Sequence, residues 1–510
     1  MQTSAARPAT STRSIPLRIR TGVFLSPYVL LFITLLVGYS YTPPRWQDWN
    51  QNSRFDLTVA IVDRGTFRID DYVANTGDYA IVDGHAYSDK APGLSLLAVP
   101  VYGLTRLAQP LGLRAVSERL AESGALSRTL TPGGEDLSSR RVDQMLALYL
   151  ATIVCVAIPA AVMGVLLAKM VERTCGCRTA AMLSALIIGL ASPVFTYAQA
   201  FYGHVPAAAC LVAALACIVL REDATLSDRR LLAIGLLLGM GVLIEYPAAL
   251  AGLPIAFWAL VLARRRAVIW GTIGAIPPLV ALGICNWIAF GTPRPVGYEH
   301  SALWQQEHDT GYLSITYPHW DAIWGISFSP FRGLFFFAPV LLLALAGVWF
   351  ALRDSRQRTL AIVALASFAA MFLFVGSSAM WWGGFAVGPR YLVPAVPMLA
   401  MPLGALIARI NAAAPLPRLA GLAGTGLLMS VSAALVLATT VARQNYPPDT
   451  IRRTLTGYVW PALEDGDIAR NVAMAISLDG VVSLVPLLVV LALGVALIGH
   501  GLLRQQAATA

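Results

Sequence analysis

Residues 52–93 read NSRFDLTVAIVDRGTFRIDDYVANTGDYAIVDGHAYSDKAPG. This segment is rich in aspartate and turn residues, whereas the chain around it is mostly apolar. An apolar run precedes it at 23–40, and another, 94–108, follows it. We therefore expect the segment to lie on a membrane surface, held at both ends.

The composition predicts a polytopic membrane protein. Of the 510 residues, 57% are hydrophobic and 13% are charged, against about 25% charged in soluble domains. The net charge of +9 comes from arginines in short clusters between apolar runs, which is typical of cytoplasmic loops and does not favour nucleic-acid binding. None of the six cysteines lies in a long polar loop, so neither a disulfide framework nor a zinc site is predicted.

Apolar runs predict about 12–13 transmembrane helices. The run at 94–108 is short and contains Pro100, so we expect a juxtamembrane or re-entrant helix there, and whether it crosses stays open. The other spans are expected at 23–40, 143–169, 179–197, 204–220, 230–244, 247–262, 268–290, 334–352, 359–376, 390–409, 418–440 and 481–503.

The distribution of arginine predicts the topology. Basic loops at 171–178, 221–230, 263–267 and 353–358 are expected on the cytoplasmic side, together with a disordered tail at 1–22. The polar and aromatic loops then share the opposite, extracytoplasmic face, and loops on a rigid scaffold are where sites usually lie. These loops are 43–142, 192–204, 291–333, 377–390 and 441–480.

Several motifs resemble those of the GT-C membrane glycosyltransferases, a superfamily that includes protein O-mannosyltransferases, the aminoarabinose transferase and arabinofuranosyltransferases. The motifs are the start NSRFDL, the block DGHAYSDKAPG, then FYGHVPAA, SPFRGLFFFAP and WWGGFAVGPRYLVPAVP. One position departs from the family pattern, because Asn52 stands where a first-loop acid is usual, two residues before Arg54.

The resemblance implies an all-α GT-C-like fold with extracytoplasmic juxtamembrane helices and loops. It implies a catalytic transmembrane module at 23–290 and a C-terminal module at 291–510. It also implies transfer, with inversion, of a hexose or a pentose such as arabinofuranose from a polyprenyl phosphate. The acceptor would be an extracytoplasmic glycan, lipid or protein, and the enzyme would lie in a bacterial inner membrane with its active site on the periplasmic side.

Such a reaction needs cations for the departing phosphate. Lys90 matches the family's phosphate-contacting lysine and ranks first, and Arg390, where a loop enters a helix, ranks second. Arg390 could equally be an interfacial arginine within a tryptophan belt. Arg54 could orient an aspartate instead of touching the donor, and His204 could donate to phosphate or only bond locally.

The reaction also needs a base for the acceptor hydroxyl. Asp78 and Glu245 rank highest, followed by Asp89 and then Asp71. Glu245 interrupts an apolar stretch, and an ionisable residue at membrane depth is a functional hypothesis by default. Asp78 could instead cap a turn, and Asp89 could simply pair with Lys90.

Aromatic residues near these motifs are candidates for binding the sugar: Tyr87, Tyr298, Trp381 and Trp382. The histidine and carboxylate residues around 298–309 fit no standard metal spacing, so we expect no metal, no divalent-cation requirement and no cofactor.

Two other functions remain open. A lipid-linked sugar flippase or transporter would need polar residues along a path through the bilayer, often within inverted repeats. A non-catalytic assembly subunit would explain why Asn52 replaces the usual acid.

Overall fold

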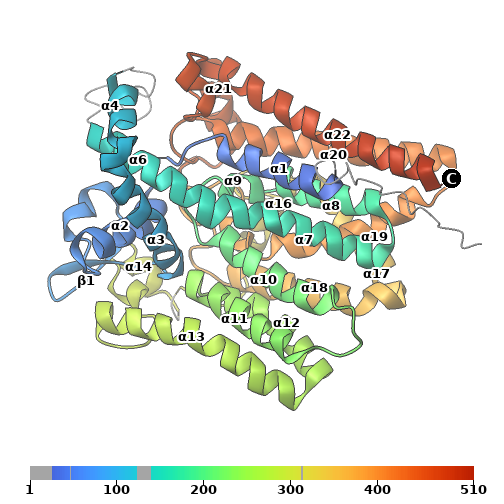
Figure 1. Cartoon of the computed structure of the whole chain (residues 1–510), viewed down its shortest axis with the longest axis horizontal. Coiled ribbons are helices and arrows are strands. Elements are labelled where there is room, and N and C mark those ends of the chain that lie inside the picture. The colour runs from blue at the N-terminus through green and yellow to red at the C-terminus, as the bar shows by residue number, and fades with distance from the viewer. Residues whose placement is uncertain (1–25, 46–47, 123–138, 312–313, 510) are drawn as a thin grey trace, which may run out of the picture.

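The computed structural model describes residues 26–45, 48–122, 139–311 and 314–509. It is an all-helical bundle in which long helices run side by side, and shorter elements gather at one end (Figure 1). The predicted tail at 1–22 lies outside the described residues. The helices of the bundle are α1 (Pro27–Ser40), α6 (Ser139–Thr152), α7 (Ile158–Cys175), α8 (Arg178–Leu190), α10 (His204–Val219), α11 (Asp228–Ile244), α12 (Ala248–Ala263), α13 (Arg265–Phe290), α17 (Leu342–Arg353), α18 (Ser355–Gly376), α19 (Ala400–Asn411), α20 (Pro415–Val441) and α22 (Val485–Thr509).

Shorter elements connect these helices or extend from one end of the bundle. They are α2 (Trp49–Arg64), α3 (Gly93–Ala108), α4 (Arg114–Glu122), α9 (Val194–Tyr197), α14 (Gln305–His308), α15 (Trp320–Ser327), α16 (Leu334–Phe337), α21 (Trp460–Glu464), the strands β1 (Tyr79–Val82) and β2 (His85–Ser88), and the 3-10 helices η1 (Asp70–Asn75), η4 (Gly297–His300), η6 (Arg390–Leu392) and η7 (Val396–Leu399).

Within the described chain, five helical segments are long and apolar enough to cross a membrane. They are Arg141–Cys175, Arg265–Phe290, Ser355–Gly376, Pro415–Val441 and Gly480–Arg504, and six shorter apolar helices accompany them. The prediction of an all-α polytopic membrane protein is therefore confirmed. The number of crossings and the division into two modules stay predictions.

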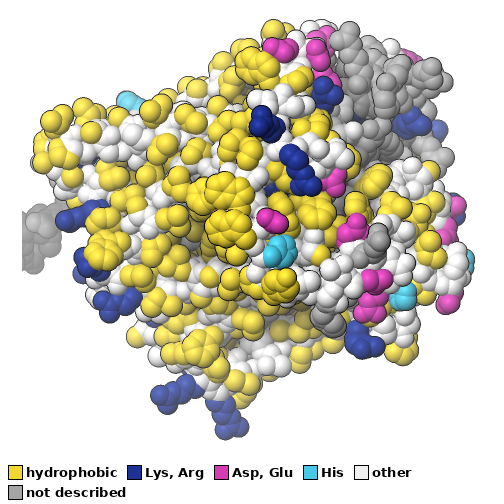
Figure 2. Space-filling view, turned by 180° about the vertical axis from the view of Figure 1, so that it is seen from behind, with side chains coloured by type: hydrophobic (Ala, Val, Ile, Leu, Met, Phe, Trp, Pro, Cys, Tyr) yellow, Lys and Arg dark blue, Asp and Glu magenta, His cyan; other side chains and the backbone are white. Residues whose placement is uncertain are grey.

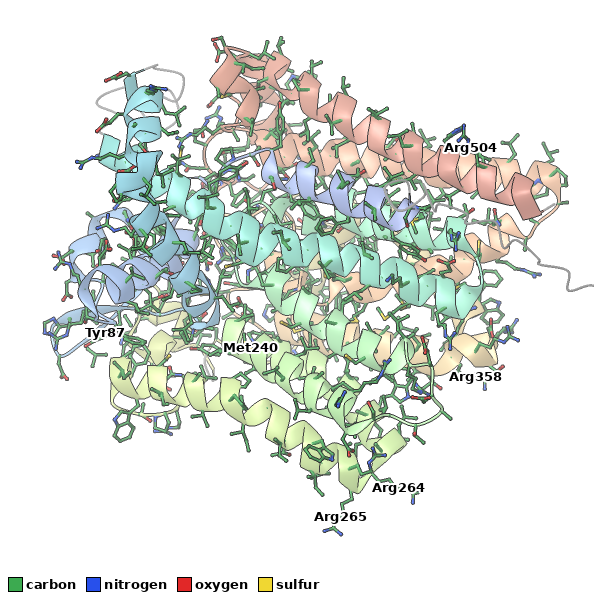
Figure 3. The ribbon with its side chains drawn as sticks, viewed as in Figure 1. Tyr87, Met240, Arg264, Arg265, Arg358 and Arg504 are labelled. Carbon is green, nitrogen blue, oxygen red and sulfur yellow. The ribbon has the colours of Figure 1, made fainter. Side chains whose placement is uncertain are left out.

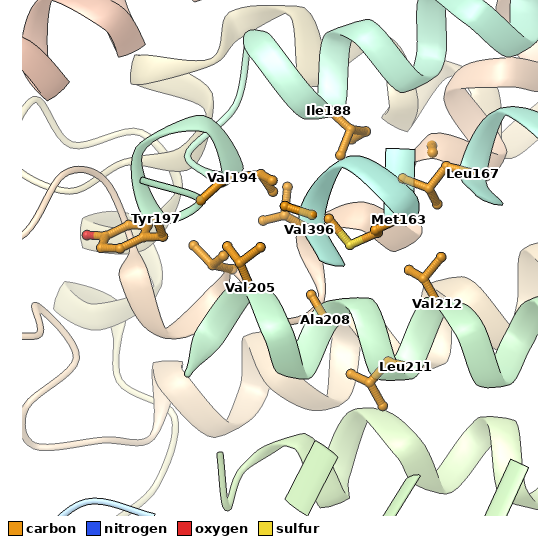
Figure 4. Close-up of a cluster of buried hydrophobic side chains, with 14 of the residues drawn as sticks. Met163, Leu167, Ile188, Val194, Tyr197, Val205, Ala208, Leu211, Val212 and Val396 are labelled. Atoms are coloured by element: carbon orange, nitrogen blue, oxygen red, sulfur yellow. The ribbon is translucent and has the colours of Figure 1, made fainter. Parts of the chain in front are cut away.

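The core forms where small and branched side chains let helices approach closely. Val205, Ala208 and Val212 lie on one side of α10, where they face Met163 and Leu167 of α7, and Leu211 points to the other side (Figure 4). Spacings of three, four and seven residues bring side chains onto one helix face, so the sequence of α10 already encodes this contact.

Glycines set the close packing of α11 against α13. A Cβ added at Gly235 would lie 1.9 Å from the carbonyl oxygen of Gly271, and one at Gly274 would lie 2.1 Å from that of Leu232. Backbone therefore meets backbone at this crossing, as is common where small residues line helix contacts in membranes.

The outer segment contains a helix that the sequence analysis did not predict. Helix α2 begins after Asp48, whose side chain accepts a hydrogen bond from the Gln51 backbone N–H, and it ends at Gly65 in the left-handed conformation (φ 63°). It is buried from Asn50 to Ala60, and most residues of its first two turns, Asn50 to Arg54, are polar. A helix can bury such residues only if their polar groups find partners, which ties α2 to specific neighbours.

The hairpin β1–β2 follows α2, with Asp83 and Gly84 at its turn, both at positive φ.

After the hairpin, α3 runs continuously from Gly93 with Pro100 inside it, so the proline does not interrupt the predicted apolar helix. Backbone atoms of Leu243 would lie 2.6 Å from a Cβ at Gly93, so the start of α3 presses against the end of α11.

The two ends of the bundle carry different residues. In Figure 3, Arg264, Arg265, Arg358 and Arg504 lie toward one end, and Tyr87 of the hairpin lies at the other. In the view from behind, hydrophobic side chains cover most of the face, and the acidic side chains lie toward the hairpin end (Figure 2). Arginines also occur at the hairpin end, where Arg64 and Arg106 form ion pairs, so the orientation in the membrane stays a prediction.

The α11–α13 contact yields a stability prediction. Substituting Gly235→Ala should destabilise the protein by about 1–3 kcal/mol, because the added methyl overlaps a backbone carbonyl that cannot move aside. Thermal unfolding in detergent or nanodiscs measures this loss.

The matched control is Gly271→Ala on the partner helix, where a Cβ would meet nothing within 4 Å. It should leave the unfolding temperature unchanged or slightly raised, since alanine favours helix over glycine. Equal effects of the two substitutions would contradict the predicted packing.

Candidate active site

A cavity of about 1080 Å³ opens at the hairpin end of the bundle. Its walls come from the start of α2, the hairpin region, the α11–α12 turn, the loop around η4, and the segments leading into η6 and following α20. The ionisable residues that line it are Arg45, Asp48, Asp78, Lys90, Arg141, Tyr202, His204, Glu245, Tyr246, Tyr298, Arg390, Tyr391 and Tyr446.

A buried ion pair joins α2 to the α11–α12 turn. Arg54 Nη2 lies 2.9 Å from Glu245 Oε2, and Arg54 Nη1 donates to the backbone carbonyls of Ala91 and Ile244. His204 Nδ1 lies 3.3 Å from the same Glu245 oxygen. Burial alone would raise the pKa of Glu245, but His204 and Arg54 outweigh it and lower the pKa to about 2.

Gly203 makes this pair possible. A Cβ at position 203 would lie 2.4 Å from Glu245 Oε2 and 3.2 Å from Arg54 Nη1. The glycine of the FYGH motif therefore leaves space for the ion pair, and His204 starts α10 directly after it.

Lys90 is the centre of a second charged cluster. Its ammonium lies 3.0 Å from Asp78 Oδ2 and 3.2 Å from Asp89 Oδ1, and 5.4 Å from the ring centroid of Tyr298. The Trp304 indole N–H donates to Asp78 Oδ1 at 3.1 Å. Two carboxylates therefore already neutralise Lys90.

The two carboxylates of this cluster differ in acidity. Burial raises the pKa of Asp78, but the Lys90 ammonium and the Arg390 guanidinium outweigh it and hold the pKa below its usual value. For Asp89, burial dominates and raises the pKa to about 6 despite Lys90. Asp89 is almost fully buried and does not line the cavity, which leaves it as a partner of Lys90.

Arg390 lines the cavity among aromatic rings. Its Nη2 donates to the Tyr391 hydroxyl at 3.2 Å, and its guanidinium lies 5.0 Å from the Tyr391 ring and 5.9 Å from the Tyr202 ring. Its buried Nε has no hydrogen-bond partner, and no carboxylate of the described residues lies within 4.0 Å. Gly383, at φ 68°, is required beside it, since a Cβ there would lie 2.9 Å from Arg390 Nε.

Asp48 is a cavity carboxylate that the sequence analysis missed. The Tyr202 hydroxyl lies 2.7 Å from its Oδ1 and 2.8 Å from its Oδ2, and no cation of the described residues forms an ion pair with it. Burial raises the pKa of Asp48 above its usual value, although Tyr202, Gln51, Arg390 and Arg45 each act to lower it. The available signal was its place as N-cap of an unpredicted helix, six residues before Arg54.

The structure also explains the departure at Asn52. This residue does not line the cavity, and its side-chain Nδ2 donates to the backbone carbonyl of Asn75. Asp48, Trp49 and Asn50 face the cavity instead. An acid at position 52 would therefore not reach the space in which Asp48 lies.

Several candidate residues lie outside the cavity wall. Asp71 is exposed and pairs with Arg64. Tyr87 packs its ring against Phe290, Trp381 packs against Phe331, and Trp382 donates to Asp449. The structure brings Asp78, Lys90, His204, Glu245, Tyr298 and Arg390 together at the cavity, with Arg54 directly behind Glu245.

Among the described residues, no group of three or more His, Cys, Asp and Glu side chains is arranged to hold a metal ion. Metal independence stays a prediction.

The geometry distinguishes a positioning role of Glu245 from a role as base. Replacing Glu245→Gln leaves the Arg54 guanidinium buried without a countercharge, which should cost about 3–5 kcal/mol. We therefore expect a large drop in unfolding temperature, and transfer activity that falls in proportion to the folded fraction. Unchanged stability with activity abolished would instead assign Glu245 to the chemistry.

No curated protein matches the sequence. The crystal structure of ArnT from Cupriavidus metallidurans bound to undecaprenyl phosphate is 17% identical, with a TM-score of 0.49 over 96% of this chain and 79% of that chain. ArnT in the apo state is 18% identical, with a TM-score of 0.47 over 93% and 77%. A likeness of this size carries no further argument.

A family model matches part of the chain. Residues 143–287 match the model described as dolichyl-phosphate-mannose-protein mannosyltransferase. The matched segment runs from α6 to α13 and includes His204 and Glu245 of the cavity wall. Over these residues the chain is similar to that family of membrane mannosyltransferases, in agreement with the resemblance of its first-loop motifs.

Proposed function

We propose that this protein transfers a sugar from a polyprenyl-phosphate donor to an acceptor hydroxyl on the extracytoplasmic side of a bacterial inner membrane. One observation carries the proposal. Among the described residues, the cavity wall holds an arginine with a buried, unpaired Nε and no carboxylate partner, Arg390, together with a carboxylate that has no cation partner, Asp48. The matched family is named for a polyprenyl-phosphate sugar donor, which supports this donor class.

Arg390 is the stronger candidate for the donor phosphate. Lys90 would have to leave Asp78 and Asp89 to bind a phosphate, whereas Arg390 has free donor capacity in place. A guanidinium also binds phosphate through two parallel hydrogen bonds, which fixes its orientation. This reverses the order expected from the sequence, and Lys90 becomes the residue that holds Asp78.

Asp48 is the stronger candidate for the general base. A carboxylate whose pKa is raised accepts a proton more readily than one held ionised by a cation. The acceptor hydroxyl would give its proton to Asp48 as its oxygen bonds to the anomeric carbon. The bond from that carbon to the phosphate oxygen breaks, polyprenyl phosphate leaves against Arg390, and attack from the opposite face inverts the anomeric centre.

The apolar part of the cavity supports a lipid donor. Pro247, Ala249 and Leu250 at the start of α12 line it, as do Phe374 and Val375 at the end of α18. These helices pack against each other, and Leu253, Phe257 and Leu373 nearby expose apolar surface. An isoprenoid chain could run from the cavity along this surface into the bilayer.

The distribution of charge favours an enzyme over a transporter. The ionisable groups of the site gather at the end of the bundle opposite the arginines marked in Figure 3, and they do not form a path through it. The same distribution supports a site on the extracytoplasmic face.

The proposal predicts separate losses for two variants. Asp48→Asn should lower the rate of sugar transfer at least about 100-fold while binding of undecaprenyl phosphate stays unchanged, because only the base is lost. Arg390→Gln should weaken undecaprenyl-phosphate binding about 10-fold or more, because one charge-assisted contact is lost. Transfer from radiolabelled lipid-linked sugar and a lipid-binding assay measure the two effects.

Asp71→Asn is the matched control, since Asp71 lies in an exposed ion pair and should affect neither measurement.

In the unmodified protein the rate of sugar transfer should fall as the pH drops through the raised pKa of Asp48, because the base becomes protonated. Full activity of the Asp48 variant would reject this assignment of the base.

A further inference from the structure

Two further arginines beside the cavity are buried without carboxylate partners. Arg45 and Arg470 are 6% and 3% exposed, and no carboxylate of the described residues lies within 4.0 Å of either guanidinium. The Nε of each is buried and has no hydrogen-bond partner. Burying an unpaired charge is costly, so such a pair requires a physical explanation.

Their present contacts are weak substitutes for an anion. Arg45 lines the cavity, donates to the Thr440 carbonyl and stacks 4.1 Å from the centroid of Tyr446. The Nη1 of Arg470 contacts the thioether sulfur of Met145 at 3.7 Å, a poor acceptor for a cation. Burial and the neighbouring Arg45 lower the pKa of Arg470 to about 9, so the two cations oppose each other.

Arg141 belongs to the same corner of the cavity. It lines the cavity from α6, four residues before Met145, and residues four apart share one helix face. Met145 contacts Arg470, so α6 presents Arg141 on the side on which Arg470 lies. Arg45 and the exposed Arg141 line the cavity, and Arg470, just before η9 (Val472–Ile476), is an electrostatic neighbour of Arg45 and contacts Met145 of α6.

A purely structural arginine looks different in this protein. Arg332 is fully buried, and it donates to the backbone carbonyls of Trp382, Phe331, Gly384 and Pro447. Arg54 likewise combines Glu245 with two backbone carbonyls. Arg45 and Arg470 are buried nearly as deeply, but the Nε of each has no hydrogen-bond acceptor.

We propose that Arg45, Arg470 and Arg141 form a second oxyanion-binding subsite, which holds a phosphate or carboxylate group of the acceptor. The inference rests on the proposed function. Asp48, Arg390 and Arg45 line the same cavity, so the proposed base shares one space with the proposed donor site and with this subsite. An acceptor anchored there by its anion would bring a neighbouring hydroxyl to Asp48.

The test uses inorganic phosphate and the full chain in phosphatidylcholine nanodiscs, with the unfolding temperature as readout. The Arg390→Gln variant serves as the background, because any phosphate response that remains in it must come from another site. We expect phosphate to raise the unfolding temperature of this variant. Adding Arg470→Met or Arg45→Gln should weaken the apparent affinity for phosphate about 10-fold or more.

The stability without phosphate separates a binding site from a structural contact. Arg470→Met removes a cation that opposes Arg45 and places a thioether beside Met145, so the unfolding temperature in phosphate-free buffer should stay the same or rise. Arg443→Gln is the matched control for charge loss, since Arg443 pairs with Asp467 in the same part of the chain and should leave the phosphate response intact.

Three outcomes would overturn the inference. The first is loss of all phosphate response in Arg390→Gln alone, and the second is a lower unfolding temperature of Arg470→Met with its phosphate response intact. The third is suppression of the response by phosphatidylglycerol, which would assign the subsite to a bilayer headgroup. Undecaprenyl-phosphate binding should stay normal in the Arg45 and Arg470 single variants, so failure here is distinct from failure of the proposed donor site.

Discussion

The ion pair between Arg54 and Glu245 is the constraint on which the site depends. It ties α2, a helix of the first outer segment, to the turn between α11 and α12 of the bundle. Because the pair is buried, both partners must stay in register, and Gly203 supplies the space they need. The position of α2 in turn fixes Asp48 at its start, so a contact outside the chemistry decides where the proposed base lies.

The sequence predicted the bundle well because membrane-spanning segments have a strong signal. The runs expected at 204–220, 268–290 and 418–440 correspond to α10, α13 and α20 within a few residues. The outer segment was harder, since its helix mixes polar residues with the apolar Phe55, Val59, Leu57 and Ala60 and gives no long apolar run. Asp48 and Gly65 bracket α2 as N-cap and left-handed end, and Asp83-Gly84 marks the hairpin turn, so these local signals were present in the sequence.

The sequence identified several of the site residues, but it did not identify the residues with which they pair. Lys90 and Arg390 stand in motifs and were found, but only the structure shows that Lys90 is neutralised by Asp78 and Asp89 whereas Arg390 is not. Asp48 pairs with Tyr202, which lies more than 150 residues away in the chain. One sequence contains no signal for a contact at that separation, so the pairing pattern that ranks these groups could not be predicted.

The cationic side chains in and around the cavity fall into two groups, those whose donors all have partners and those with unpaired donors. Those paired with carboxylates or saturated by carbonyls, such as Arg54 and Lys90, hold the walls in place. Arg390 and Arg45 each have a buried Nε without a hydrogen-bond partner, and an unsatisfied buried donor raises the free energy of the protein without its ligand. An anionic substrate would supply the missing hydrogen-bond partners when it binds. The same unpaired arginines would therefore destabilise the empty site and increase its affinity for the substrate. The rigid frame around Arg54 and Glu245 allows the protein to maintain this arrangement without collapse.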